Sequence, residues 1–340
     1  MIKDLVTAIS RAMDGRYQLA YADASHEMEK ERAGYSSYTF HPSGELQVQA
    51  AYRQNPYTDK ALFSSFDLLL INGNHYRGAQ QVLILDKDKR ESVRKRIDQL
   101  DNVRFLISTG KPTEIFDFLL ERHPYLANLS VYPITELQGI TDHLRSLIQE
   151  KTAPVKGLVL AGGQSLRMGT DKGLLDYFGK SQRYYAAELL EKMNLQTYLS
   201  VRKEQQVEEE NRIEDVFLGL GPFGAICSAF QFDPNSAWLT LATDLPYVDE
   251  ELIMRLLDNR DPSKVATAVK GKGKEFPEPL VTIWEPKAYP VLLQFLAQGI
   301  SCPRKVLINT DIATVETDAA YIFNVNTPEE FETVKKEIRG

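Results

Sequence analysis

A loop that follows an apolar run near the middle of the chain carries residue types that bind phosphate. Residues 158–160 are Leu, Val and Leu, as in a parallel strand covered on both faces, and Gly162 and Gly163 follow at once. Glycine lets the main chain approach a ligand where a Cβ would collide, and exposed backbone N–H groups bind anions. Arg167 and Lys172 add two positive charges that suit a polyphosphate. The pattern predicts a phosphate-binding loop; the alternative is a tight turn with incidental surface charges.

A carboxylate stands at the end of another apolar run. Asp244 ends the stretch LTLATD, and Pro246 stops the strand shortly after it. At the carboxyl end of a parallel strand, a side chain points into the crevice where open α/β sheets bind ligands. Magnesium bound to a nucleotide takes only one or two protein carboxylates. We therefore predict that Asp244 binds Mg²⁺; the alternative is an aspartate that caps a helix or shapes a turn.

Polar residues elsewhere in the second half are further candidates for the same site. Asp215 precedes a Gly-Pro pair at 221–222 that is typical of a helix start. Asn324 and Asn326 occupy alternate positions, so they share one face of an extended segment. Asp215 could instead simply end a strand, and the asparagines could tie down a helix entrance.

The elements that must position these residues follow an alternating pattern. Apolar strand-like runs alternate with amphipathic helix-like runs, which indicates α/β layering around a parallel sheet. In the first half, strands are expected at 66–73 and 103–109, and helices at 87–100, 113–123 and 140–150. A short polar stretch, KTAPVK, then precedes a new first strand, so we predict a boundary near residues 151–155 and two domains, 1–150 and 156–340.

The second half repeats the alternation with more elements. Strands are expected at 155–163, 196–203, 236–246, 264–270 and 278–284, and helices at 181–193, 222–232, 249–259, 287–299 and 327–340. The last helix has a clear start, because Thr327 can be the N-cap, Pro328 the first helical residue and Glu330 the partner in a capping box.

Composition excludes several classes of protein. The chain has 340 residues, 43% of them hydrophobic, and a net charge of −7, which argues against a nucleic-acid binder. No apolar run approaches the length of a membrane span, and the N-terminal residues lack the features of an export signal. Cys227 and Cys302 are far apart and form no metal-spaced pair. These features predict a reduced, cytoplasmic protein.

The complete string LAGGQSLRMGTDK, residues 160–172, resembles the signature of the MobA-like nucleotidyltransferases. In that family LAGG, a Ser or Thr, RMG and DK recur at this spacing. The family also has D-x-P, as at 244–246, an aspartate before a Gly-Pro turn, as at Asp215 and 221–222, and N-x-N-T-P, as at 324–328. The resemblance covers residues 156 to about 335, and it implies a three-layer Rossmann-like nucleotidyltransferase fold.

The resemblance implies molybdenum cofactor guanylyltransferase activity, in which the terminal phosphate of molybdopterin attacks GTP and pyrophosphate leaves. The implied catalytic residues are Arg167, Lys172 and Asp244, with Mg²⁺ on Asp244. The implied nucleotide-binding residues are Leu160, Ala161, Gly162, Gly163, Lys172, Ser200, Asp215 and Asp244. Asn324 and Asn326 would close the site near the acceptor. An acceptor molybdoenzyme or a chaperone is the partner that this activity implies.

Several alternatives stay open. Relatives that use CTP more usually carry LAAG, so Gly162 after Ala161 favours guanylyl transfer, whereas Ser200 stands where the family often has asparagine. Sugar-phosphate nucleotidyltransferases share the fold and a similar loop. A nucleotide-sensing scaffold would keep the fold without the chemistry. Residues 173–181 end like a Walker A loop, but Gly173 is one position too early for that motif.

The first domain shows a second, fainter resemblance. Residues 66–86 and 102–110 resemble elements of the GTP-binding adaptor MobB, with Asn72-Gly73 where that family has Glu-Gly. No GxxxxGK[ST] precedes them, so phosphate binding would be lost and a scaffold or docking role is expected. The spacing of the histidines His26, His41 and His75 supports no metal site.

Overall fold

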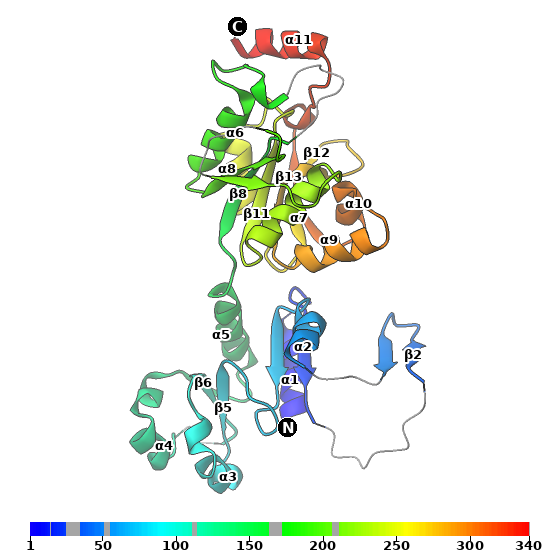
Figure 1. Cartoon of the computed structure of the whole chain (residues 1–340). Helices are drawn as coiled ribbons and strands as arrows, with labels where there is room; N and C mark the ends of the chain where they lie inside the picture. Colours follow the sequence, from blue (N-terminus) through cyan, green and yellow to red (C-terminus); the bar gives the residue numbers. More distant parts are fainter. Residues whose placement is uncertain are drawn as a thin grey trace. The chain divides into compact units, whose positions relative to one another are not determined.

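The structure is a computed structural model that describes residues 1–13, 15–24, 35–50, 55–110, 114–162, 172–205 and 211–339 (Figure 1). By contacts between Cα atoms the chain divides into two compact units, Met1–Lys151 and Thr152–Gly340. Within the described ranges, no helix combines the length and apolar content needed to cross a bilayer.

The first unit is a small α/β unit with parallel strand pairing. Its elements are α1 (Ile2–Ala12), β1 (Leu19–Ala22), β2 (Ser37–Phe40), β3 (Leu46–Gln49), α2 (Pro56–Phe63), β4 (Leu68–Ile71), β5 (Gln81–Leu85), α3 (Arg90–Arg94), β6 (Val103–Ser108), α4 (Asp117–Arg122), β7 (Val131–Pro133) and α5 (Leu137–Gln149). Strand β1 pairs with β4, and β5, β6 and β7 form a second parallel sheet. Helices α1 and α5 pack against Phe105 and Ile107 of β6 through Leu5, Ile9 and Leu144.

The charged helix expected at 87–100 is wrong as one continuous element. The structure has a 3-10 turn at Lys87–Lys89, the short helix α3, and another 3-10 turn at Ile97–Gln99. This segment offers the core only Val93, Ile97 and Leu100. Because most helical stability in proteins comes from packing of an apolar face, three contacts do not hold fourteen residues in one helix. The helix expected at 113–123 is likewise shorter, as α4.

Two of the three histidines singled out in the sequence of the first unit, His41 and His75, lie within the described residues. His26 lies outside the described residues, and His41 is exposed. His75 Nε2 lies 3.8 Å from Asp23 Oδ1. Across the part of the chain that the structure describes, no group of three or more His, Cys, Asp or Glu side chains is placed to hold a metal ion.

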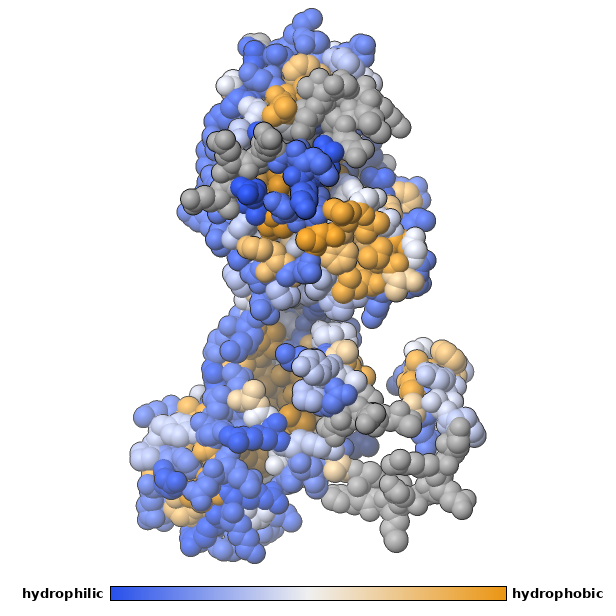
Figure 2. Space-filling model, viewed as in Figure 1, coloured by the Kyte–Doolittle hydropathy of each residue, from blue (hydrophilic) through white to orange (hydrophobic). Residues whose placement is uncertain are grey.

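Among the exposed apolar side chains of the described residues, some gather on a hairpin of the first unit and others over two helices of the second unit (Figure 2). On the hairpin of β2 and β3, Tyr38 pairs with Val48 and Phe40 with Leu46, so these four exposed residues share one face. In the second unit an apolar area lies over α7 (Pro222–Phe232) and α9 (Ala288–Ala297), which expose Phe232 and Leu293. Neither place adjoins the predicted phosphate-binding loop in sequence.

The second unit is built on a seven-stranded sheet with helices on both sides (Figure 1). Besides α7 and α9, its elements are β8 (Val155–Leu160), α6 (Gln182–Glu191), β9 (Thr197–Val201), β10 (Arg212–Glu214), β11 (Ala237–Ala242), α8 (Glu250–Asp258), β12 (Ala266–Gly271), β13 (Glu278–Trp284), α10 (Pro303–Ile308), β14 (Ile312–Thr317) and α11 (Pro328–Arg339). The strand order is β10-β9-β8-β11-β13-β12-β14. The predicted three-layer α/β fold is confirmed.

The sheet is mixed rather than wholly parallel, which corrects the sequence-based expectation. Strand β13 runs antiparallel to both of its neighbours, β11 and β12. Residues 272–277, which connect β12 to β13, are too few for the crossover that a parallel neighbour requires, so the chain returns as a hairpin. The expected strand list also lacked β10 and β14. Both lie at the sheet edges, where partial exposure weakens the apolar pattern.

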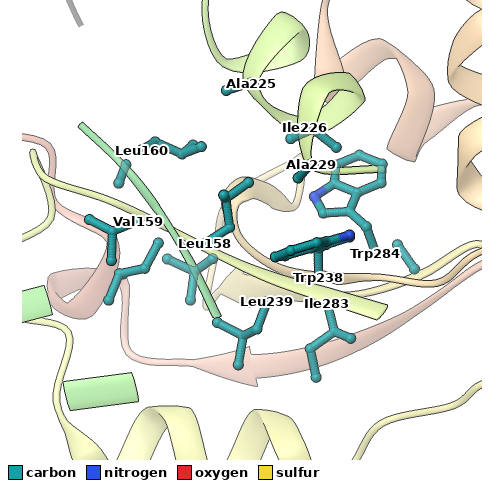
Figure 3. Packing of buried hydrophobic residues seen from close by; sticks show 14 of the residues in the cluster. Leu158, Val159, Leu160, Ala225, Ile226, Ala229, Trp238, Leu239, Ile283 and Trp284 are labelled. Atoms are coloured by element: carbon teal, nitrogen blue, oxygen red, sulfur yellow. The ribbon is translucent and has the colours of Figure 1, made fainter. Parts of the chain in front are cut away.

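The core of this unit lies on both faces of the central strands. Trp238 and Trp284 form a cross-strand pair that is fully buried near Ile226 of α7 (Figure 3). The next pair, Leu239 and Ile283, points to the opposite face because side chains alternate along a strand. Strands covered on both faces in this way read as continuous apolar runs in the sequence.

Candidate active site

Three parallel strands end side by side at one edge of the second unit's sheet. Leu160, the last residue of β8, is in register with Ser200 of β9 and with Ala242, the last residue of β11. Residues that follow these strands therefore meet at the same edge, where open α/β sheets bind ligands. A cavity of about 690 Å³ lies there. Six predicted site residues line it: Leu160, Gly162, Lys172, Ser200, Asp215 and Asp244.

Lys172 connects two parts of the site that are distant in sequence. Its Nζ lies 3.4 Å from Asp244 Oδ2 and donates a hydrogen bond to Asn326 Oδ1 at 2.8 Å. The backbone N–H of Val325 donates to the carbonyl oxygen of Asp244 at 2.9 Å, which holds this segment against the end of β11. Asn324 takes part through its carbonyl oxygen, which accepts from Asn326 Nδ2 at 3.2 Å.

The helix start that follows Asn326 is confirmed as a capping box. The Thr327 N–H donates to Glu330 Oε2 at 3.1 Å, and the Glu330 N–H donates to Thr327 Oγ1 at 3.2 Å. Glu330 Oε2 also accepts from the Asn326 N–H at 2.6 Å. Glu330 therefore does more than cap α11, because it also fixes the backbone of the residue that contacts Lys172.

Asp244 is a largely buried carboxylate, and one of its two oxygens lacks a hydrogen-bond partner among the described residues. Burial raises the pKa of Asp244 above its ordinary value of 3.8, and the Lys172 ammonium opposes that rise. Within the described part of the chain, Asp244 Oδ1 is buried and has no hydrogen-bond partner. An unsatisfied carboxylate oxygen at a cavity wall is the kind of ligand that Mg²⁺ takes. The residues present here therefore fit a nucleotide-bound magnesium ion.

A second carboxylate, Asp215, also lines the cavity and follows β10, which lies three strands away from β11 in the sheet. Ser200 Oγ donates to Asp215 Oδ1 at 2.7 Å. Burial raises the pKa of Asp215, while the Ser200 hydrogen bond and the Arg202 charge oppose the rise. A Cβ on Gly162 would lie 3.2 Å from Asp215 Oδ2 and 3.5 Å from Arg202 Cγ. The space left by Gly162 is thus used by neighbouring side chains of the site itself.

The segment between β10 and α7 forms one wall of the cavity and is seated on the helix. Ser228 Oγ accepts from the Val216 N–H at 2.9 Å and donates to the carbonyl oxygen of Gly224 at 2.7 Å. Gly221, the N-cap of α7, has a φ of 56°, which glycine adopts without strain. A Cβ on Gly224 would lie 2.2 Å from the carbonyl oxygen of Phe217. The close approach of this loop to α7 therefore requires glycine at 224.

We expect Gly224→Ala to lower the free energy of unfolding by about 1–3 kcal/mol, the usual effect of overpacking a close contact. The backbone of Phe217, rather than a flexible side-chain end, would have to move. Thermal unfolding followed by circular dichroism measures the change. Gly73→Ala is the control, because nothing lies within 4 Å of a Cβ built there. An unchanged midpoint for Gly224→Ala would contradict the described packing.

Two predicted site residues lie outside the described part of the chain, and a third, Ala161, contributes backbone hydrogen bonds. Gly163 and Arg167 lie within 163–171, outside the described residues. The carbonyl oxygen of Ala161 accepts from Gln205 Nε2 at 2.9 Å, and its N–H donates to the carbonyl oxygen of Ser200 at 3.1 Å. The backbone of Ala161 thus joins the ends of β8 and β9.

Sequence reasoning assigned no role to part of the cavity lining: Arg202, Glu204, Phe217, Leu218, Thr243 and Leu280. Arg202 directly follows β9, so the strand-end argument that selected Asp244 could have selected it. Leu280 comes from the antiparallel strand β13, and no signal in the sequence points to it.

The second unit contains a match to a known protein family. Residues 157–313 match a family described as the MobA-like NTP transferase domain. The molybdenum cofactor biosynthesis bifunctional protein of Synechocystis is 33% identical over 183 residues, 52% of this chain and 53% of that protein. The chain thus spans about half the length of that relative. The molybdenum cofactor guanylyltransferase of Pseudomonas putida KT2440 is 27% identical over 52% of this chain and 95% of its own. A solved structure, molybdopterin-guanine dinucleotide biosynthesis protein A of Archaeoglobus fulgidus, has a TM-score of 0.46 at 24% identity, over 54% of this chain and 98% of that chain.

Proposed function

We propose, from the premise that residues 157–313 belong to the MobA-like NTP transferase domain family, that the second unit transfers GMP from GTP to the terminal phosphate of molybdopterin. Pyrophosphate leaves, and the product is the guanine dinucleotide of the cofactor. The names of the relatives from Synechocystis and Pseudomonas putida support this assignment. The LAGG string at 160–163, which favours guanylyl over cytidylyl transfer, supports it too.

One observation carries the proposal: a cation, a carboxylate and an amide meet at the wall of a cavity large enough for a nucleotide. Lys172 lies within 3.4 Å of Asp244 and 2.8 Å of Asn326, although 154 residues separate Lys172 from Asn326. Phosphoryl-type transfer depends on positioning and charge neutralisation, so the protein need not supply a nucleophile.

The roles of the chain's own residues follow from where they lie. Gly162 leaves room at the end of β8, Lys172 places its charge on the phosphates, and Asp244 would hold the metal ion. Bound Mg²⁺ supplies charge neutralisation on the phosphates. Asn326 orients the Lys172 ammonium, and Arg167 adds the second charge of the loop. Attack by the acceptor phosphate then proceeds in line with the departing pyrophosphate.

The surroundings of this reaction are part of the proposal. Cys227 and Cys302 are both free thiols, which is usual in a reducing compartment, and we place the reaction in the cytoplasm. The dinucleotide product would pass to an acceptor molybdoenzyme or a chaperone. The first unit, with no phosphate-binding loop in its sequence, would serve as a scaffold or docking module.

One assay tests the assignment. The full chain is mixed with Mg²⁺, molybdopterin and each nucleoside triphosphate in turn, and released pyrophosphate is measured. We expect release with GTP that depends on molybdopterin. Release with CTP alone, or with a sugar phosphate as acceptor, would select a different nucleotidyltransferase. Binding of nucleotide without release under any condition would favour a sensing scaffold.

A further inference from the structure

The β9–β10 end of the cavity carries two charged side chains on neighbouring strand ends. Arg202 directly follows β9, and Asp215 directly follows β10. The Asp215 N–H donates to the carbonyl oxygen of Val201 at 2.9 Å, which fixes the two ends together. Both residues line the cavity. Lys172 and Asp244, which would handle the phosphates and the metal, line other parts of the wall, so this end is left for the rest of the nucleotide.

Ser200, the predicted nucleotide-binding residue of β9, has no hydrogen left to offer a base. Its side chain is fully buried, and its hydroxyl donates to Asp215 Oδ1 at 2.7 Å. A hydroxyl carries one donor, and that donor is used inside the protein. A direct donor to a base at this end of the cavity must therefore come from another residue.

Arg202 has the donors, and its position is fixed. Its backbone N–H donates to Gln205 Oε1 at 2.8 Å, and Gln205 Nε2 donates to the carbonyl oxygen of Ala161 at 2.9 Å. The stem packs over Gly162, where a Cβ would lie 3.5 Å from Arg202 Cγ. Among the described residues, the buried Nε of Arg202 has no hydrogen-bond partner. Arg202 is thus a cavity residue whose backbone and stem are held in place, and its guanidinium carries the donors that Ser200 lacks.

We propose that Arg202 determines base selection by donating two hydrogen bonds to O6 and N7 of guanine. This inference rests on the proposed function, because it assigns the base end of that same nucleotide site. The planar guanidinium fork matches the two acceptors on this edge of guanine. Adenine presents an amino group in place of O6, and cytosine also presents an amino group. In either case a hydrogen-bond donor of the base would face a donor of the Arg202 guanidinium. Arg202 therefore favours guanine and disfavours both alternatives.

Equilibrium binding tests this without any turnover. Calorimetry compares GTP with 7-deaza-GTP, in which a C–H group replaces N7, on the unmodified full chain. We expect GTP to bind about 3- to 10-fold more tightly, roughly half of the free energy of one bidentate contact to a base, because 7-deaza-GTP keeps the O6 acceptor. ATP and CTP should bind at least as weakly as 7-deaza-GTP. Equal binding of GTP and 7-deaza-GTP would overturn the proposal, and this comparison needs no variant that could misfold.

Variants then assign the effect to the side chain. Arg202→Met should bind GTP, 7-deaza-GTP and ATP alike, and Arg202→Lys, which keeps the charge but not the fork, should also lose selectivity. Lys203→Met, an exposed neighbour, is the matched control and should keep it. An equal loss of affinity for every nucleotide in Arg202→Met would make Arg202 a phosphate contact and overturn the proposal. Selective guanine binding without pyrophosphate release would leave this inference standing while the proposed function failed.

Discussion

Asp244→Asn should lower pyrophosphate release from GTP by about a thousandfold, the upper end of what one electrostatic contact contributes to a transition state. The amide keeps the shape of the carboxylate and removes the charge that would hold Mg²⁺. Within the described structure, Asp244 Oδ1 has no hydrogen-bond partner. This oxygen is therefore available to bind a metal ion. The rate is measured as pyrophosphate release at saturating GTP and molybdopterin, over a range of Mg²⁺ concentrations.

The fold should survive this change or gain slightly in stability. Burial raises the pKa of Asp244, which means that the folded protein disfavours the ionised form, and this gain from a neutral amide offsets the loss of the 3.4 Å contact with the Lys172 ammonium. Retained turnover would remove the metal-binding role, and a thermal midpoint well below that of the unmodified protein would show that the carboxylate also stabilises the fold.

Asp233→Asn is the matched control for Asp244→Asn. Asp233 lies just before β11, at the opposite end of that strand from Asp244. It accepts from Lys156 Nζ and Ser236 Oγ, each at 2.7 Å, and the Lys156 hydrogen bond in particular lowers its pKa from 3.8 to about 2. A depressed pKa in the folded state stabilises the protein above pH 4, and that contribution is lost as the pH falls towards 2. Asp233→Asn should therefore reduce stability at neutral pH and leave turnover unchanged.

Lys172→Met should lower kcat/KM for GTP by about a hundredfold or more, because it removes a point charge from the phosphate site. The same substitution should strengthen the binding of Mg²⁺ in the absence of nucleotide. The ammonium lies 3.4 Å from Asp244 Oδ2 and repels a cation approaching that carboxylate. Without it, Mg²⁺ alone should bind roughly tenfold more tightly, as the attraction to an unneutralised carboxylate predicts. Calorimetry with Mg²⁺ in the absence of nucleotide measures this second effect.

The two readouts of Lys172→Met distinguish a role at the site from a structural one. Lys180→Met is the control, since Lys180 pairs with Glu188 on the exposed side of α6. It should alter neither metal binding nor kcat/KM. In Lys172→Met combined with Asp244→Asn, the gain in Mg²⁺ affinity should disappear. Tighter Mg²⁺ binding that persisted in this double variant would show that the ion binds away from Asp244.

The local parts of the site are those that the sequence determined. Gly162 and Lys172 belong to one short loop, and Asp244 ends an apolar run before a proline. In each case a few consecutive residues specify the strand, the turn that follows it and the functional side chain. The capping box of Thr327 and Glu330 is equally local. Because the carboxyl ends of parallel strands meet at one edge, these signals also predicted that the residues would come together.

Only the tertiary structure decided which partners these residues have. Strand β13 returns antiparallel and brings Leu280 into the cavity, and Asn326 reaches Lys172 across 154 residues of sequence. The Ser200 hydroxyl donates its hydrogen bond to Asp215, and Arg202 lines the cavity. Strand register and side-chain direction arise from packing between distant segments, and a one-residue shift in register would turn each of these side chains to the other face of the sheet. The residue types thus predicted the chemistry of the site, and the packing of the sheet assigned each residue its place in it.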